Sequence, residues 1–331
     1  MFVADLTLKG SDASFVDRHF RDFCVSQVLK GNGSSSDQSK IVEIIAHRNT
    51  EELKFVRQTY SFVYNQDLLQ LLSQKSNLFT RVLYLQLSEP HNRDAEIIRR
   101  TFSGRSLDLS ILTEIICTRS SSDLRIVKEA YHSRYNADLR QDISYKMSGI
   151  LKEILVAVLN SSNYSTARVD VSLSMCDAKT LYEAVGSGKY VDQNSIISIL
   201  SQRSTCQIKS ILSSYKQLYG HEFIKFLKKD RCGEFGKQLR VVIRCIQSPE
   251  KQFAKQLRAA LKTGNAQETL IRIVVTRAGT DIRQINATFT AKTGWSLESL
   301  IRNEFNNSSC YNTDGAYSLV GDVLIALLRR A

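Results

Sequence analysis

The sequence contains very little proline and no long apolar run, and each shortage excludes a class of protein. Only two prolines, Pro90 and Pro249, interrupt 331 residues, so most of the chain is free to form helices. No apolar stretch approaches the roughly 20 residues that a membrane-spanning helix needs, so any membrane contact would be peripheral. The strict alternation of apolar and polar residues that is typical of strands is nowhere sustained. The sequence therefore predicts an all-α protein.

Paired-cysteine motifs and a secretion signal are missing as well. The seven cysteines are odd in number, and no two of them have CxxC spacing. Several fall on apolar helical stripes, so we expect reduced, largely buried thiols in a cytosolic protein. Residues 1–6 carry neither a basic segment nor an apolar core, and no signal peptide is expected.

Basic residues outnumber acidic ones. The 45 Lys and Arg residues against 33 Asp and Glu give a net charge of +12. A surplus of this size attracts an anionic partner, either acidic lipid headgroups or nucleic acid. It is equally compatible with a solvated basic surface that keeps the protein soluble.

One pattern occurs four times without gaps. It is aligned on four arginines, Arg48, Arg119, Arg203 and Arg277. An isoleucine stands four residues before each arginine, and aliphatic residues stand five and eight after it. An aromatic residue follows at twelve: Tyr60, Tyr131, Tyr215 and Phe289. A polar residue stands nineteen positions after each arginine, and an apolar residue stands twenty positions after it. The polar residues are Asp67, Asp138, Glu222 and Ser296. Columns kept in register predict an internal repeat whose shared apolar positions form the core.

Each copy contains five short helical segments. The predicted organisation is an N-terminal arm at 1–11, repeats at 12–89, 90–161, 169–248 and 249–331, and a linker at 162–168. The linker is rich in serine and falls in the longest interval between reference arginines, which suggests that the repeats are grouped two and two. Armadillo and HEAT solenoids are less compatible, because their repeats have two or three helices in ~40–47 residues.

The repeat resembles the annexin repeat, and several stretches are similar to plant-type annexins. These stretches are Ala46-His47-Arg48-Asn49, Arg57-Gln58-Thr59-Tyr60, Cys117-Thr118-Arg119-Ser120 and Glu129-Ala130-Tyr131-His132-Ser133-Arg134-Tyr135. The resemblance implies four repeats of five short helices, forming a slightly curved disc whose convex face holds calcium sites that bridge to acidic phospholipid. In such a site the loop Met-Lys-Gly-X-Gly-Thr supplies carbonyl oxygens, and an acid forty residues after its last glycine supplies a carboxylate.

The fourth copy comes closest to that pattern. Glu304 stands forty residues after Gly264, the glycine of the loop at 260–265. The ligands that the resemblance implies are the carbonyl oxygens of Ala260, Lys262 and Gly264 and the carboxylate of Glu304. One of the two glycines of the family loop is missing and Asn265 replaces its threonine, which bears on affinity more than on geometry. The alternative is a plain connecting loop beside an unrelated surface Glu.

The other copies keep less of the site. Leu29, Gly31 and Gly33 match the loop of the first copy, but Lys75 stands where the acid belongs, so a weak calcium site or none is expected there. The second and third copies lack the paired glycines, and they have Lys146 and Asp230 at the acid position. Basic residues near the loops, above all Lys30, Lys75 and Lys189, would face lipid and bind it partly without calcium. Scattered solvated charges are the alternative.

Three further features have an ordinary explanation beside a functional one. His47 lies where plant annexins carry a histidine linked to peroxidase-like activity and haem, but a lone histidine is more often structural. Cys117 and Cys245 resemble a cysteine pair thought to be redox-sensitive, yet both fall on apolar stripes that favour buried packing. Ile271-Arg272-Ile273 is a string of the kind proposed for actin contact, and core packing explains it equally well.

The sequence thus predicts a cytoplasmic protein, peripheral on membranes, that binds calcium and acidic phospholipids as a monomer or weak oligomer. Actin or another protein is a further candidate partner, and no specific nucleic acid is expected. The competing hypotheses are a calcium-independent helical scaffold that binds protein or nucleic acid, and a redox-linked, peroxidase-like activity. No enzyme is expected, because the five histidines form no recognisable catalytic spacing and no phosphate loop occurs.

Overall fold

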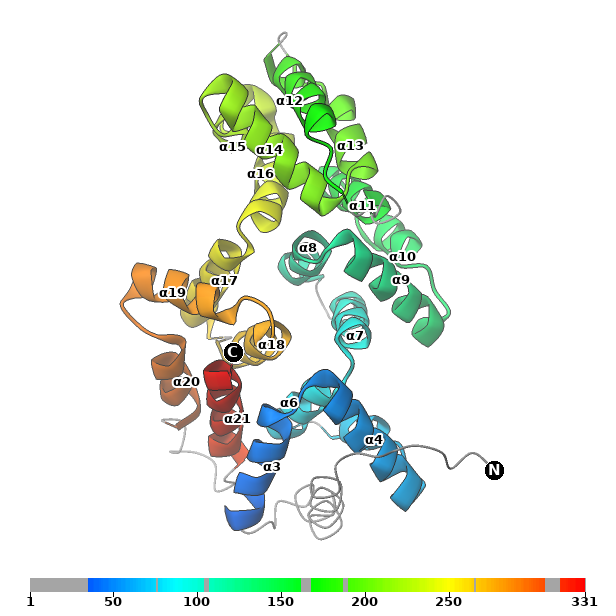
Figure 1. Cartoon of the computed structure of the whole chain (residues 1–331), viewed down its shortest axis with the longest axis vertical. Helices are drawn as coiled ribbons and strands as arrows, with labels where there is room; N and C mark the ends of the chain where they lie inside the picture. The colour runs from blue at the N-terminus through cyan, green and yellow to red at the C-terminus, as the bar shows by residue number, and fades with distance from the viewer. Residues whose placement is uncertain are drawn as a thin grey trace. The chain divides into compact units, whose positions relative to one another are not determined.

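The structure is a computed structural model that describes residues 35–75, 77–103, 107–161, 168–186, 190–264, 266–306 and 316–330. Every regular element in these ranges is a helix, so the all-α prediction is confirmed (Figure 1). The chain forms two compact units, unit 1 with residues 1–89 and 253–331, and unit 2 with residues 90–252. No helix in the described part of the chain has the length and apolar character that crossing a membrane requires.

Unit 1 combines the first and fourth copies of the repeat. The first copy contributes α3 (Ser35–His47), α4 (Thr50–Tyr64), α5 (Leu68–Ser73) and α6 (Leu78–Leu87). The fourth contributes α18 (Ala266–Arg277), α19 (Ile282–Thr293), α20 (Leu297–Asn306), α21 (Ala316–Arg330) and most of α17 (Pro249–Thr263). Helix α21 packs against α3 and α6, and α18 also packs against α6. The first copy of the repeat therefore packs against the last copy.

Unit 2 combines the second and third copies. The second copy forms α7 (Pro90–Ser103), α8 (Leu109–Thr118), α9 (Ser121–Tyr135), α10 (Leu139–Lys146) and α11 (Ile150–Ser161). The third forms α12 (Val171–Gly186), α13 (Gln193–Gln202), α14 (Thr205–Tyr219), α15 (Phe223–Phe226), the 3-10 turn η2 (Asp230–Cys232) and α16 (Gly233–Gln247). Helix α11 packs against α13 and α16.

The pairing of the copies differs from the one that the linker at 162–168 suggests. That segment lies inside unit 2 and does not separate two units. A serine-rich composition indicates only that a segment contributes few apolar side chains to a core. The apolar faces of α8, α11, α13 and α16 decide which copies pack together.

The repeated apolar columns form the core of both units. Every member of the isoleucine, aliphatic and aromatic columns is buried, and the aromatic members Tyr131, Tyr215 and Phe289 have no exposed surface. Three members of the polar column nineteen residues after the arginine, Asp67, Asp138 and Ser296, cap helices instead. Asp67 accepts hydrogen bonds from the backbone N–H groups of Leu69 and Gln70, at 2.7 and 3.2 Å, at the start of α5. Asp138 caps α10 in the same way.

The arginine column fixes the corner between the second and third helices of a copy. In the second copy Arg119 ends α8 and reaches back to α7, where Nε and Nη2 donate to the two carboxylate oxygens of Asp94 at 2.6 and 2.9 Å. Both side chains are buried. Burial is the largest influence on the pKa of Arg119 and acts to lower it, but the Asp94 carboxylate outweighs burial and leaves that pKa raised. In the third copy Arg203 binds Asp177 in the same way.

We expect Asp94→Asn to lower the free energy of unfolding by about 3 to 5 kcal/mol, because it leaves the buried guanidinium of Arg119 without a counter-charge. The matched control is Glu129→Gln, which removes one carboxylate from an exposed pair with Arg125 on α9 in the same unit. That control should cost less than about 0.5 kcal/mol. Urea unfolding followed by circular dichroism measures both values. Equal losses in the two variants would contradict a special role for the buried pair.

Candidate metal centre

The fourth-copy loop begins at the C-terminal end of α17. Ala260 and Lys262 lie in the last turn of that helix, where backbone carbonyls have no partner further along the helix. The helix dipole places partial negative charge at the same end, which favours a bound cation. Gly264 then turns the chain with a φ of 71°, a left-handed conformation that suits glycine, and α18 begins two residues later.

Glu304 lies beside the start of α18. It is half-buried near the end of α20, and its backbone carbonyl accepts a hydrogen bond of 3.0 Å from Nε2 of Gln267. Gln267 stands three residues after Gly264, in the first turn of α18. The fold therefore brings a residue forty positions away into the neighbourhood of the loop. Gln267 is the link that sequence reasoning missed, because an amide that contacts a distant backbone leaves no recognisable pattern.

One side chain of the loop would compete with a metal ion for a carbonyl oxygen. The hydroxyl of Thr263 donates to the carbonyl oxygens of Ala259 and Ala260, at 3.4 and 3.3 Å. Ala260 is one of the carbonyl ligands that the resemblance implies, and the hydroxyl occupies part of its acceptor capacity. Counted back from Gly264, Thr263 stands at the variable position of the family loop and Lys262 at its first glycine. A residue without a hydroxyl at position 263 would leave the Ala260 oxygen free.

The oxygens gathered here fit calcium. Calcium accepts six to eight oxygen ligands in flexible geometry, and helix-end carbonyls with a single carboxylate are donors of this type. The described residues contain no group of three or more His, Cys, Asp and Glu side chains that could hold a metal ion. A site built here would thus be incomplete by itself, and outside oxygens such as water or a lipid phosphate would fill the remaining positions.

In the second and third copies a positively charged side chain lies at or beside the position that corresponds to Glu304. Lys146, at the acid position of the second copy, lies 5.6 Å from the centre of the Phe102 ring in the last turn of α7. In the third copy Asp230 is exposed, while the guanidinium of its neighbour Arg231 donates to the backbone carbonyl of Val185 in the last turn of α12. A cation therefore lies near the end of the first helix in both copies.

The remaining predicted site residues are placed only in part. Lys75 and Lys262 are exposed to solvent. Five further predicted residues lie outside the described part of the chain: Leu29, Lys30, Gly31, Gly33 and Lys189. Asn265 lies outside it as well. His47 is an exposed residue in the last turn of α3. Arg272 and the isoleucines on either side of it are buried, which favours the packing explanation of that string over an actin contact.

The two candidate redox cysteines are buried in unit 2. Cys117 on α8 and Cys245 on α16 are each 1% exposed, and the two helices pack together. Burial, and to a smaller extent the neighbouring Cys245, raises the pKa of the Cys117 thiol well above its usual value. A raised pKa disfavours the reactive thiolate, so the geometry favours packing, and redox sensitivity stays a prediction. Cys176 and Cys206 are exposed, contrary to the expectation of largely buried thiols.

Comparisons with known proteins agree with this architecture. The family model for annexins matches residues 93–158, 176–242 and 252–309. Annexin D7 of Arabidopsis thaliana is 34% identical over 298 residues, which cover 89% of this chain and 90% of that protein. Annexin A13 of Mus musculus is 33% identical over 275 residues, covering 82% and 86%.

Solved structures show the same fold. Annexin III matches with a TM-score of 0.77 at 23% identity, covering 96% of this chain and 95% of its own. The calcium-bound structure of annexin (Sm)1 matches with a TM-score of 0.73 at 19% identity, covering 94% and 90%. The chain belongs to the annexin family, whose members are calcium-dependent phospholipid-binding proteins.

Proposed function

We propose that this protein binds acidic phospholipid membranes peripherally, with calcium held at the fourth repeat. The observation that supports the proposal is the hydrogen bond from Gln267, three residues after the left-handed turn at Gly264, to the backbone carbonyl of Glu304. The carbonyl oxygens of Ala260, Lys262 and Gly264 and the carboxylate of Glu304 would bind the ion. A lipid phosphate would complete its coordination, which makes calcium affinity depend on the membrane.

Part of the binding is proposed to need no calcium. The net charge of +12 attracts an acidic surface, and each Lys or Arg close to the headgroups contributes about 1 kcal/mol. Lys30, Lys75 and Lys189 are the proposed contacts beside the weakened sites. Because mobile ions screen these contacts over about 10 Å at 0.1 M salt, this part should weaken as salt is added. The proposed role is binding, not catalysis.

We expect Glu304→Gln to abolish most of the calcium-dependent binding to vesicles of phosphatidylserine and phosphatidylcholine. The amide keeps the shape of the side chain but removes its negative charge and one strong calcium ligand. Co-sedimentation across a calcium titration should show at least a tenfold increase in the calcium needed for half-maximal binding, an order-of-magnitude expectation for one charged ligand.

The matched control is Glu298→Gln at the other end of α20. Glu298 pairs with Arg302 and Arg329 at the surface of the same unit, so this variant makes the same change of net charge away from the loop. Its calcium requirement should equal that of the unchanged protein. A silent Glu304→Gln variant would exclude the fourth repeat as the calcium site.

We expect Thr263→Gly to strengthen calcium binding. Glycine removes the hydroxyl that donates to the Ala260 carbonyl. The calcium needed for half-maximal vesicle binding should fall several-fold, roughly the effect of freeing one carbonyl ligand from a hydrogen bond of about 1 kcal/mol. Thr263→Val, which removes only the hydroxyl, separates this cause from greater loop flexibility. If both variants require more calcium than the unchanged protein, the hydroxyl does not compete with the ion.

A further inference from the structure

One stretch of the third repeat differs in charge from its counterparts. Residues 225–231, called the basic segment below, contain Lys225, Lys228, Lys229 and Arg231 with one acid, Asp230, for a net charge of 4 − 1 = +3. The register of the repeat aligns them with residues 70–76, 141–147 and 299–305. These stretches carry net charges of +1, 1 − 1 = 0 and 1 − 1 = 0. The surplus is therefore a property of this copy and not of the fold.

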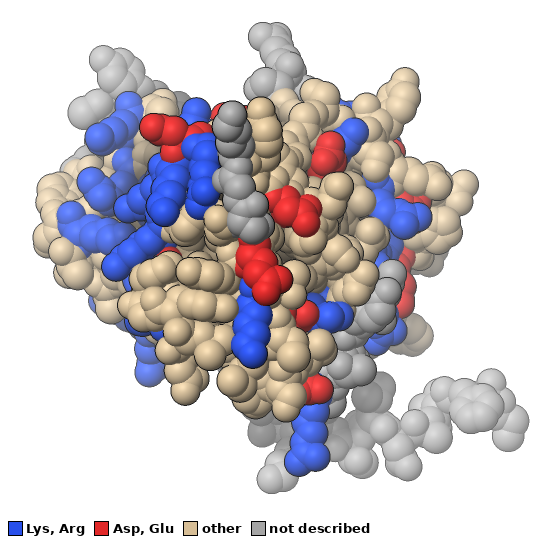
Figure 2. Space-filling view, turned by 90° about the horizontal axis from the view of Figure 1, so that it is seen from above, with Lys and Arg blue, Asp and Glu red and all other residues tan. Residues whose placement is uncertain are grey.

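The three lysines of the basic segment have no ion-pair partner in the described part of the chain. Lys225, Lys228 and Lys229 are exposed, and no carboxylate of the described residues lies within ion-pair distance of their ammonium groups. By contrast, flanking Lys216 and Lys237 each pair with a glutamate, at 4.0 and 3.6 Å. In Figure 2, Lys and Arg side chains gather on one side of the visible face. Such a group of unpaired cations attracts an anion.

A partly exposed aromatic ring lies among these cations. The Lys229 ammonium is 3.9 Å and the Arg231 guanidinium 4.6 Å from the centre of the Phe226 ring. Phe226 occupies the column of Asp142, which in the second repeat accepts a hydrogen bond of 2.6 Å from the Tyr131 hydroxyl. In the third repeat the equivalent hydroxyl of Tyr215 is buried and has no hydrogen-bond partner in the described structure. Phe226 therefore cannot accept the hydrogen bond that Asp142 accepts from the aromatic column in the second repeat.

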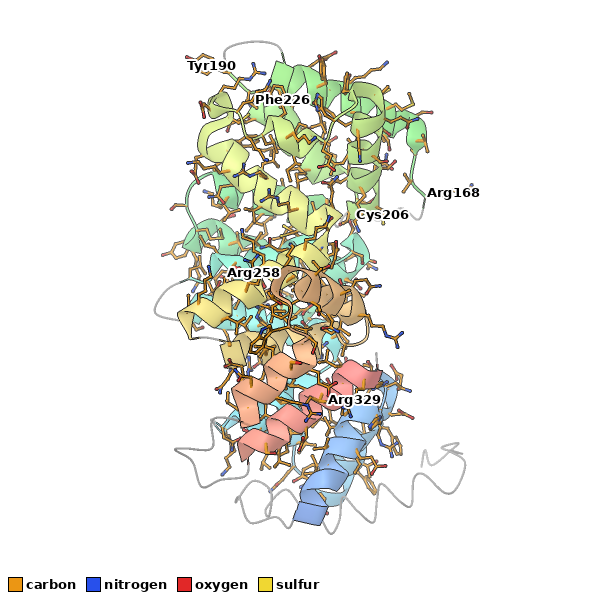
Figure 3. The ribbon with its side chains drawn as sticks, turned by 90° about the vertical axis from the view of Figure 1, so that its left-hand side faces the viewer. Arg168, Tyr190, Cys206, Phe226, Arg258 and Arg329 are labelled. Carbon is orange, nitrogen blue, oxygen red and sulfur yellow. The ribbon has the colours of Figure 1, made fainter. Side chains whose placement is uncertain are left out.

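The basic segment is held in a defined position. Gly236 on α16 packs against it so closely that a Cβ atom there would lie 2.7 Å from the carbonyl oxygen of Leu227. Arg231 ties the segment to α12 through the Val185 carbonyl. Tyr190, 87% exposed, follows the same helix by a few residues, and Figure 3 shows Tyr190 and Phe226 in the same part of unit 2. Asp230 of the third repeat aligns with Glu304 of the fourth, and its neighbours Lys228, Lys229 and Arg231 are cationic.

We propose that the basic segment, together with Tyr190, is a calcium-independent site for the phosphate of an acidic phospholipid headgroup. Ammonium and guanidinium groups bind phosphate oxygens through charge-assisted hydrogen bonds, and tyrosine and other aromatics favour the boundary between water and lipid. A single-stranded nucleic acid fits less well, because the Phe226 ring that a base would stack on is already covered by Lys229 and Arg231. This inference rests on the membrane binding proposed above.

The test is co-sedimentation of the full chain with vesicles of equal parts phosphatidylserine and phosphatidylcholine, in a calcium chelator and in calcium. The variant is Lys228→Ala/Lys229→Ala. The matched control is Lys179→Ala/Lys209→Ala, which removes two exposed lysines from α12 and α14 of the same unit. In chelator the first variant should lose about tenfold or more in binding, from two surface charges, and the control should change by less than about twofold. Calcium should still increase the binding of both variants.

Each other outcome overturns the inference in a recognisable way. Equal losses in the two double variants would mean that net charge, and not the basic segment, attracts the membrane. If the unchanged protein binds these vesicles in calcium but not in chelator, the inference fails while the calcium-dependent function stands. If it binds in neither condition, the proposed function fails too. If Lys228→Ala/Lys229→Ala loses affinity for a single-stranded RNA but not for vesicles, the ligand is nucleic acid.

Discussion

The buried ion pair between Arg119 and Asp94 shows the constraint on which the repeat depends. A guanidinium held away from water needs a carboxylate with matched geometry, and two parallel hydrogen bonds provide it. The pair joins the end of α8 to α7 and so sets the angle at which the chain enters α9. Arg203 and Asp177 repeat the arrangement in the third copy with somewhat more solvent access. In these two copies the arginine is therefore a structural residue that fixes the corner.

The fourth copy shows what happens when the partner is lost. Gln252 stands where the Asp94 column would place an acid, and Arg277 pairs instead with Asp281, four residues later, at 2.7 Å. That carboxylate is then occupied, and Asp281 makes no side-chain hydrogen bond as the N-cap of α19. Helix α19 has 12 residues, whereas the equivalent α4, α9 and α14 have 15 each. Arg277 thus keeps an ion pair, and α19 is shorter by about one turn than its counterparts.

The features that repeat could be predicted from the sequence, and the features that occur once could not. The isoleucine, aliphatic and aromatic columns predicted the core correctly, because burial imposes the same residue type at the same spacing in every copy. Asp67 and Asp138 belong to a column whose capping role is local and thus visible in sequence. The packing of α21 on α3 joins the two ends of the chain, and no local pattern records it.

The candidate site divides in the same way. The forty-residue spacing, which comes from the family resemblance, predicted that Glu304 lies near the loop, and Gln267 beside the loop does contact its backbone. The spacing could not show that Gln267 makes the connection, that Thr263 bonds the Ala260 carbonyl, or that Arg231 reaches Val185. Each of these contacts depends on the direction of a single side chain. The prediction of largely buried cysteines does not hold for Cys176 and Cys206 for a similar reason. Both are exposed, because the opposite faces of α12 and α14 are the buried ones.

One electrostatic requirement connects the third and fourth repeats. The last carbonyls of a helix carry partial negative charge and lack partners, so a cation nearby stabilises the end of a helix. At α12 the guanidinium of Arg231 is that cation, and it is part of the chain. At α17 Lys262 lies in the last turn, but the described hydrogen bonds bring no cationic side chain to these carbonyls, and the proposed calcium ion would take that role. A cation of fixed charge attracts phosphate at all calcium concentrations, whereas a bound ion does so only when calcium is supplied. A protein that carries both devices on one scaffold would have a basal affinity for acidic membranes on which calcium builds.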